Sequence, residues 1–168
     1  GAWLALNYAV SAPERVEKLV LLSPGGLLPM VRQFNLRGML MALVPTRLTV
    51  NAFMRWLGFT GIAARPVLDL MYLGLKHFRV PRETSRVMPT VFSDDELRAM
   101  RAPTLLLIGD HEVISDPAKA LARARRLIPD FHGDLVPRSR HDMCVSQYRI
   151  VDARVLDFLK KTRTDGRG

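Results

Sequence analysis

Short runs of apolar residues predict the strands of this chain. Residues 18–23 read Lys-Leu-Val-Leu-Leu-Ser and are followed by Pro24, Gly25 and Gly26, and residues 104–108 read Thr-Leu-Leu-Leu-Ile before Gly109. Short, unbroken apolar runs that end at turn residues are typical of strands buried on both faces of a parallel sheet. We predict these two strands and a third over residues 131–136.

Apolar residues at three- and four-residue spacing predict helices elsewhere. One covers residues 1–12 and ends before Pro13, which cannot continue a helix. Another runs from Asp116-Pro117 to about Ile128, with aspartate as N-cap and proline at the first helical position. A last amphipathic helix covers about residues 146–161, and a frayed tail is expected at 162–168.

The region between the first two strands differs in character. From about Pro29 to Phe92 the spacing predicts three or four helices, separated by prolines and glycines. Helices and strands therefore alternate around one helical insertion, and this order indicates an α/β fold with a parallel sheet. The chain divides into residues 1–28, a helical insertion at 29–92, and residues 93–168.

Composition and charge narrow the class of protein. The chain has 168 residues, of which 48% are hydrophobic, so a globular domain with a real core is expected. The net charge is +9, and the insertion alone holds nine basic and two acidic residues. No nucleic-acid-binding motif accompanies this charge, and a solvated basic face is the simpler interpretation, so no nucleic-acid partner is expected.

The single cysteine, Cys144, excludes a disulfide framework and a cysteine-rich zinc site. Its expected role is that of a small buried apolar residue. A lone thiol fits a reducing compartment, so a cytoplasmic location is expected. No apolar run approaches the roughly 18 residues of a membrane span, so no stable membrane insertion is expected.

Candidate catalytic groups follow the predicted strands, because parallel α/β sheets gather functional groups at the carboxyl ends of their strands. The second strand is followed by Gly109-Asp110-His111-Glu112, and the third by a segment that contains His141. A histidine that acts as general base needs a carboxylate to fix its tautomer. The two ends belong to strands joined by one helical crossover, so they are expected to be near each other.

Four segments together resemble the α/β-hydrolase family. Residues 1–9 are similar to the helix after the family's nucleophile elbow, and residues 13–23 to its next loop and strand. Residues 103–112 are similar to its acid-bearing strand, and His141 matches the catalytic histidine. The resemblance implies the C-terminal part of that fold, with Glu112 as triad acid, His141 as base, and a nucleophile two residues before Gly1, outside this chain.

Other polar residues near these positions have simpler interpretations. We interpret Asp110 as a turn residue, Asp116 as a helix cap, and Ser23 as structural, since Ser-Pro-Gly-Gly lacks a strained elbow. Three further histidines have no evident carboxylate partner and are expected on the surface, namely His77, His111 and His132.

The insertion lies where family members carry a lid over the active site. Its aromatic and methionine side chains suggest an apolar acyl or aromatic small-molecule substrate, although the same side chains could pack the lid itself. These residues are Phe53, Met54, Trp56, Phe59 and Tyr72.

The resemblance implies an esterase-like hydrolase that needs no metal and no organic cofactor. The fold also hosts peptidases, epoxide hydrolases, dehalogenases and carbon–carbon bond hydrolases, and these remain alternatives. A non-catalytic member that binds a ligand in the lid groove is a further alternative. The identity of the nucleophile would distinguish these reaction classes and the non-catalytic alternative. The oligomeric state is left open.

Overall fold

The computed structural model describes residues 1–78 and 89–160. Its three strands are β1 (Leu19–Leu22), β2 (Thr104–Gly109) and β3 (Phe131–Val136). They form a parallel sheet in the order β1-β2-β3, in which Leu22 pairs with Leu107 and Gly109 with Val136. The three strands and their parallel arrangement confirm the prediction from the apolar runs.

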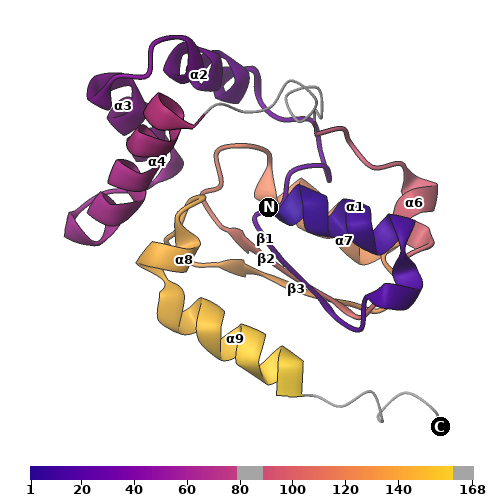
Figure 1. The fold of residues 1–168 in the computed structure, drawn as a ribbon. Coiled ribbons are helices and arrows are strands. Elements are labelled where there is room, and N and C mark those ends of the chain that lie inside the picture. Colours follow the sequence, from indigo (N-terminus) through magenta and orange to yellow (C-terminus); the bar gives the residue numbers. More distant parts are fainter. Residues whose placement is uncertain (79–88, 161–168) are drawn as a thin grey trace, which may run out of the picture.

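Strand β2 organises the core because all six of its residues are buried. Its side chains alternate between the faces of the sheet, as expected for a strand. Leu106 and Ile108 join a cluster with α1 (Ala2–Ser11) and α7 (Pro117–Leu127). Leu105 and Leu107 join a second cluster with α9 (Tyr148–Lys160). Helices therefore cover both faces of the sheet (Figure 1).

Local sequence explains where the helices of this core begin. Asp116 accepts a hydrogen bond from the Lys119 amide at 3.0 Å and caps α7, as predicted. A short helix that the apolar spacing did not predict, α6 (Asp94–Arg98), begins with a capping box between Ser93 and Glu96. The remaining short elements are η1 (Pro13–Arg15) and α8 (Met143–Ser146).

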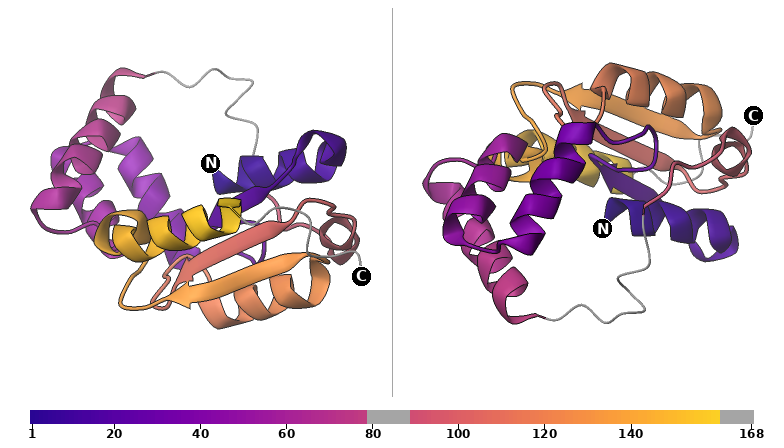
Figure 2. Two further views of the ribbon diagram at one scale, coloured as in Figure 1. Left: turned by 90° about the horizontal axis from the view of Figure 1, so that it is seen from below. Right: turned by 90° about the horizontal axis from the view of Figure 1, so that it is seen from above.

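The insertion contains α2 (Arg32–Leu43), α3 (Arg47–Leu57), η2 (Ile62–Ala64) and α4 (Arg65–His77). It has a hydrophobic cluster of its own, built on the buried face of α3. That face consists of Val50, Phe53, Met54 and Leu57, which follow one another at helical spacing. The helices of the insertion stand together to one side of the sheet (Figure 2).

Cys144 differs from the expectation drawn from the sequence. Cys144 is exposed on α8, so its predicted burial is wrong, because Met143 takes the inward position. Residues 79–88 of the predicted insertion and the tail predicted to fray lie outside the described residues. Among the residues that the structure describes, no helix is long and apolar enough to cross a membrane.

Candidate active site

The loops that follow β2 and β3 meet at the carboxyl ends of these adjacent strands. The Nδ1 atom of His141 lies 3.0 Å from Oε2 of Glu112. The strands are paired up to Gly109 and Val136, so the two loops leave the sheet side by side. The structure thus brings together the two residues that the sequence singled out.

Glu112 is held as a buried, hydrogen-bonded carboxylate. Its side chain is only 3% exposed, and its Oε1 atom accepts the amides of Val113 at 2.8 Å and Ile114 at 3.0 Å. Burial acts to raise the pKa of Glu112, but hydrogen bonds and charge from His141, the Ile114 amide and the Ser23 hydroxyl outweigh it, so the pKa is lowered.

The ionised Glu112 fixes the state of the imidazole. A carboxylate can only accept hydrogen bonds, so Nδ1 of His141 donates to it and Nε2 of the neutral ring carries a lone pair. The His141 side chain is 29% exposed, whereas Glu112 is almost completely covered. The pair can therefore accept a proton at Nε2 from a reacting group and stabilise the resulting imidazolium.

Asp110 anchors the start of the histidine loop. Its carboxylate accepts the amides of Arg138 at 3.0 Å and Ser139 at 3.1 Å, and it pairs with His111 Nδ1 at 2.7 Å. Burial acts to raise the pKa of Asp110, but these hydrogen bonds and the charge of His111 lower it to about 2. Asp110 is thus more than the turn residue we expected, because it fixes the backbone that leads to His141.

Ser23 belongs to the site in a way that the sequence did not suggest. It directly follows β1 with a positive φ of 43°, is 8% exposed, and donates its amide to the Leu107 carbonyl at 2.8 Å. Its hydroxyl donates to the Met143 sulfur at 4.0 Å, and it lies close enough to Glu112 to help lower the pKa of that carboxyl. Its place at a strand end was a usable signal, but only the fold shows that it contacts the carboxylate.

The other three histidines are on the surface, as expected. His111 and His132 are 70% and 51% exposed, and His77 is an exposed residue at the end of α4. The expectation that they lack carboxylate partners is wrong for two of them. His111 pairs with Asp110, and His132 pairs with Asp130 at 3.3 Å. Their exposure nevertheless separates these pairs from the Glu112–His141 pair.

The five residues proposed to contact a substrate lie in different places. Phe53 and Met54 are buried in the cluster of the insertion, while Trp56, Phe59 and Tyr72 are partly buried around it. Tyr72 stacks with Arg47, the first residue of α3, at 4.6 Å. The end of α3 contacts the histidine loop, because the His141 amide donates to the Leu57 carbonyl at 3.1 Å. At 1.5 Å per residue the start of α3 is roughly 15 Å from that end, so Trp56 and Phe59 lie nearer the histidine loop than Tyr72 does.

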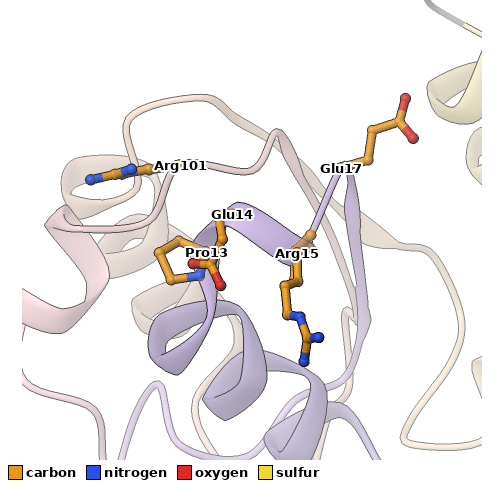
Figure 3. Close-up of a pocket in the computed structure, with 6 residues that line it drawn as sticks. Pro13, Glu14, Arg15, Glu17 and Arg101 are labelled. Carbon is orange, nitrogen blue, oxygen red and sulfur yellow. The ribbon is translucent and has the colours of Figure 1, made fainter.

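A cavity of about 400 Å³ lies at the opposite ends of the strands. It is lined by residues 13–17 and Arg101, which precede β1 and β2. Figure 3 shows that the side chains of Arg15, Glu17 and Arg101 point away from one another. Without converging polar groups, this cavity has no arrangement suited to holding a ligand. Within the described ranges, no three His, Cys, Asp or Glu residues form a group suited to a metal ion.

Comparisons with known proteins agree with this architecture. No family model matches the chain. It is 31% identical over 163 residues to the uncharacterized carboxylesterase nap of Bacillus subtilis, which covers 94% of this chain and 53% of the relative. The chain spans about half the length of the curated relatives it matches.

Solved structures with similar folds include two Bacillus subtilis esterases. Naproxen esterase (carboxylesterase NP) matches with a TM-score of 0.80 at 28% identity, over 95% of this chain and 57% of that chain. Carboxylesterase CesB (YbfK) matches with a TM-score of 0.75 at 27% identity, over 92% and 55%. With its parallel sheet, its helices on both faces and its helical insertion, the chain has the α/β-hydrolase fold.

Proposed function

We propose that this chain contributes the acid and the base of a Ser-His-Glu triad to an esterase-like hydrolase. The observation that carries the proposal is the 3.0 Å contact between His141 Nδ1 and the nearly inaccessible Glu112 carboxylate. The likeness to carboxylesterases supports the same chemistry. The nucleophile in this proposal is a serine two residues before Gly1.

In the proposed reaction, the serine oxygen attacks the ester carbonyl carbon while Nε2 of His141 takes the hydroxyl proton. The tetrahedral intermediate expels the alcohol, which receives that proton from His141. Water then attacks the acyl-enzyme, again giving its proton to Nε2, and the carboxylic acid product leaves as the serine is restored. Glu112 stays ionised throughout and stabilises each imidazolium that forms.

We propose a small-molecule ester with an apolar acyl or aromatic group as the substrate. Trp56 and Phe59 are the best placed of the five candidate side chains, because both are partly buried and lie at the end of α3 next to the histidine loop. The buried Phe53 and Met54 would not contact the substrate directly but would support the side chains that do.

A cytoplasmic location stays a prediction.

The role of the pair is tested in the intact enzyme with a chromogenic ester of a short fatty acid. His141→Ala and Glu112→Gln are each expected to lower kcat/KM by roughly a thousandfold or more, because the first removes the base and the second removes the carboxylate that fixes its tautomer. His111→Ala is the matched control, since His111 also pairs with a carboxylate but is 70% exposed.

Wild-type turnover that survives in the His141→Ala variant would refute the role of this histidine. An equal loss of activity in the His111→Ala control would show that the assay reports on loop stability and not on the triad. An intact enzyme that hydrolyses no ester would refute the proposed reaction.

A further inference from the structure

The C-terminal end of α3 rests directly on the histidine loop. The amide of His141 donates to the Leu57 carbonyl at 3.1 Å, and the Arg140 guanidinium donates to the Trp56 carbonyl at 3.3 Å. The last carbonyls of a helix have no partner inside the helix. Here two of them are satisfied by the loop that carries the proposed catalytic base.

Gly58 makes this close approach possible. It ends α3 in the left-handed conformation, with φ of 111°, while its own amide and that of Phe59 turn back to carbonyls inside the helix. A Cβ atom at Gly58 would lie 2.5 Å from Oδ1 of Asp142 and 2.9 Å from Cβ of Arg140. These two neighbours directly precede and follow His141. Any larger residue at position 58 would therefore collide with the loop on either side of the histidine.

The loop has little freedom to move away from such pressure. Asp142 is 7% exposed, and its Oδ1 atom accepts the Arg140 amide at 3.1 Å, which closes a tight turn around His141. On the other side, a Cβ atom at Gly109 would overlap the Arg140 carbonyl oxygen and lie 2.6 Å from that of Ser139. The loop is therefore packed between the end of β2 and the end of α3.

The insertion also contacts the loop that carries Glu112. The Val31 amide donates to the Ile114 carbonyl at 2.8 Å, and Val113 and Ile114 pack in the cluster of the insertion. Both amides that bind the Glu112 carboxylate belong to these two residues. The insertion is thus hydrogen-bonded to His141 itself and to the loop that carries Glu112.

We propose that Gly58 is a positioning residue, because it lets the Leu57 carbonyl at the end of α3 hold His141 in line with Glu112. The inference rests on the proposed function, in which His141 is the base. It means that the insertion does more than cover a substrate, since the catalytic geometry is complete only while α3 is docked on the histidine loop.

The test compares Gly58→Ala with Gly61→Ala. Gly61 also has a positive φ, of 76°, but no atom lies within 4 Å of its Cβ position. Both variants strain the same insertion, and only Gly58→Ala presses on the histidine loop. Two NMR signals report on His141, namely the chemical shift of the Nδ1 proton bonded to Glu112 and the hydrogen-exchange rate of its amide.

Gly58→Ala is expected to shift the Nδ1 proton signal and to speed exchange of the His141 amide at least tenfold, while Gly61→Ala leaves both unchanged. In the intact enzyme, kcat for the ester is expected to fall by roughly ten- to a hundredfold in Gly58→Ala only, since small misplacements of a catalytic group are costly. If Gly58→Ala does not fold, Arg140→Met, which removes one surface contact to α3, should raise the exchange rate several-fold.

Equal NMR changes in Gly58→Ala and Gly61→Ala would overturn the inference, as would unchanged His141 signals in Gly58→Ala or in Arg140→Met. The NMR signals do not depend on turnover. If they separate the two glycine variants while the intact enzyme hydrolyses no ester, the docking stands and the proposed function fails. If His141-dependent turnover is present but the signals do not separate the variants, the proposed function stands and the docking inference fails.

Discussion

Two carboxylates that follow β2, only two residues apart, have different tasks. Asp110 binds the backbone amides at the start of the histidine loop, and Glu112 binds the imidazole itself. Spacing along the chain could not distinguish them, because both follow the same strand end. Glu112 was selected by its resemblance to the acid position of the family, and the structure supplies the physical reason, since only Glu112 reaches His141.

Asp110→Asn is expected to destabilise the fold by on the order of 1–2 kcal/mol at neutral pH, because ionised Asp110 holds two amides and His111. Its pKa of about 2 in the folded protein lies below the roughly 3.9 of an unfolded chain, so this stability is present above pH ~4. It is lost as the pH falls toward 2. Urea unfolding from pH 7 to 2 should therefore show wild type and variant converging at low pH, whereas a constant difference would contradict the assignment.

Among the helices and strands, the positions at which β2 and α3 end affect the geometry of the candidate site more than their lengths do. Strand β2 ends in Gly109, where a Cβ atom would meet the carbonyls of Ser139 and Arg140, while Gly58 caps the end of α3 against the same loop. A side chain at either glycine would occupy space that the loop already fills. The geometry of the candidate site thus depends on where two elements stop, a property that apolar spacing describes poorly.

Gly109→Ala is expected to lower the free energy of unfolding by about 1–3 kcal/mol, because its Cβ meets backbone atoms that cannot rotate away. Gly74→Ala in α4 is the control. No atom lies within 4 Å of the Gly74 Cβ position, and alanine is favoured over glycine inside a helix by roughly 0.5–1 kcal/mol. Urea denaturation should move the two midpoints in opposite directions, and an unchanged midpoint for Gly109→Ala would contradict the packing described here.

At the scale of the whole molecule, the described residues form a three-stranded parallel sheet with helices on both faces and a helical insertion beside the candidate site. The chain spans about half the length of its curated relatives. In the proposed reaction, the nucleophile and the amides that stabilise the oxyanion come from outside these residues. The acid–base pair by itself has no group that can form the acyl-enzyme.

The 168-residue chain alone is therefore expected to show no His141-dependent hydrolysis of a chromogenic short-chain ester. The measurement compares the chain with its His141→Ala variant at equal concentration. Equal background rates are the expected result. Turnover that disappears in the variant would show that this chain contains a nucleophile of its own, and Ser23, whose hydroxyl contacts Glu112, would be the first to examine.

Most of the helices and strands, and the approximate position of the candidate site, could be predicted from the sequence. Unbroken apolar runs mark buried strands, and the Asp-Pro start of α7 is a local signal, so both are readable without tertiary contacts. The short helix α6 was missed because its signal is a capping box and not an apolar stripe. The exposure of Cys144 was missed because adjacent residues of a helix face different directions, and only the packing of α8 shows that Met143 and not Cys144 faces the core.

The contacts between distant side chains could not be predicted in this way. The contacts of Ser23 with Glu112, of Asp110 with the histidine loop, and of Leu57 with His141 join residues that are 28 or more positions apart. Such contacts depend on strand order, on loop direction and on which elements pack against each other, and none of these leaves a local pattern in the sequence. Local patterns supplied the candidate groups, and their arrangement follows from how the strands and the insertion pack.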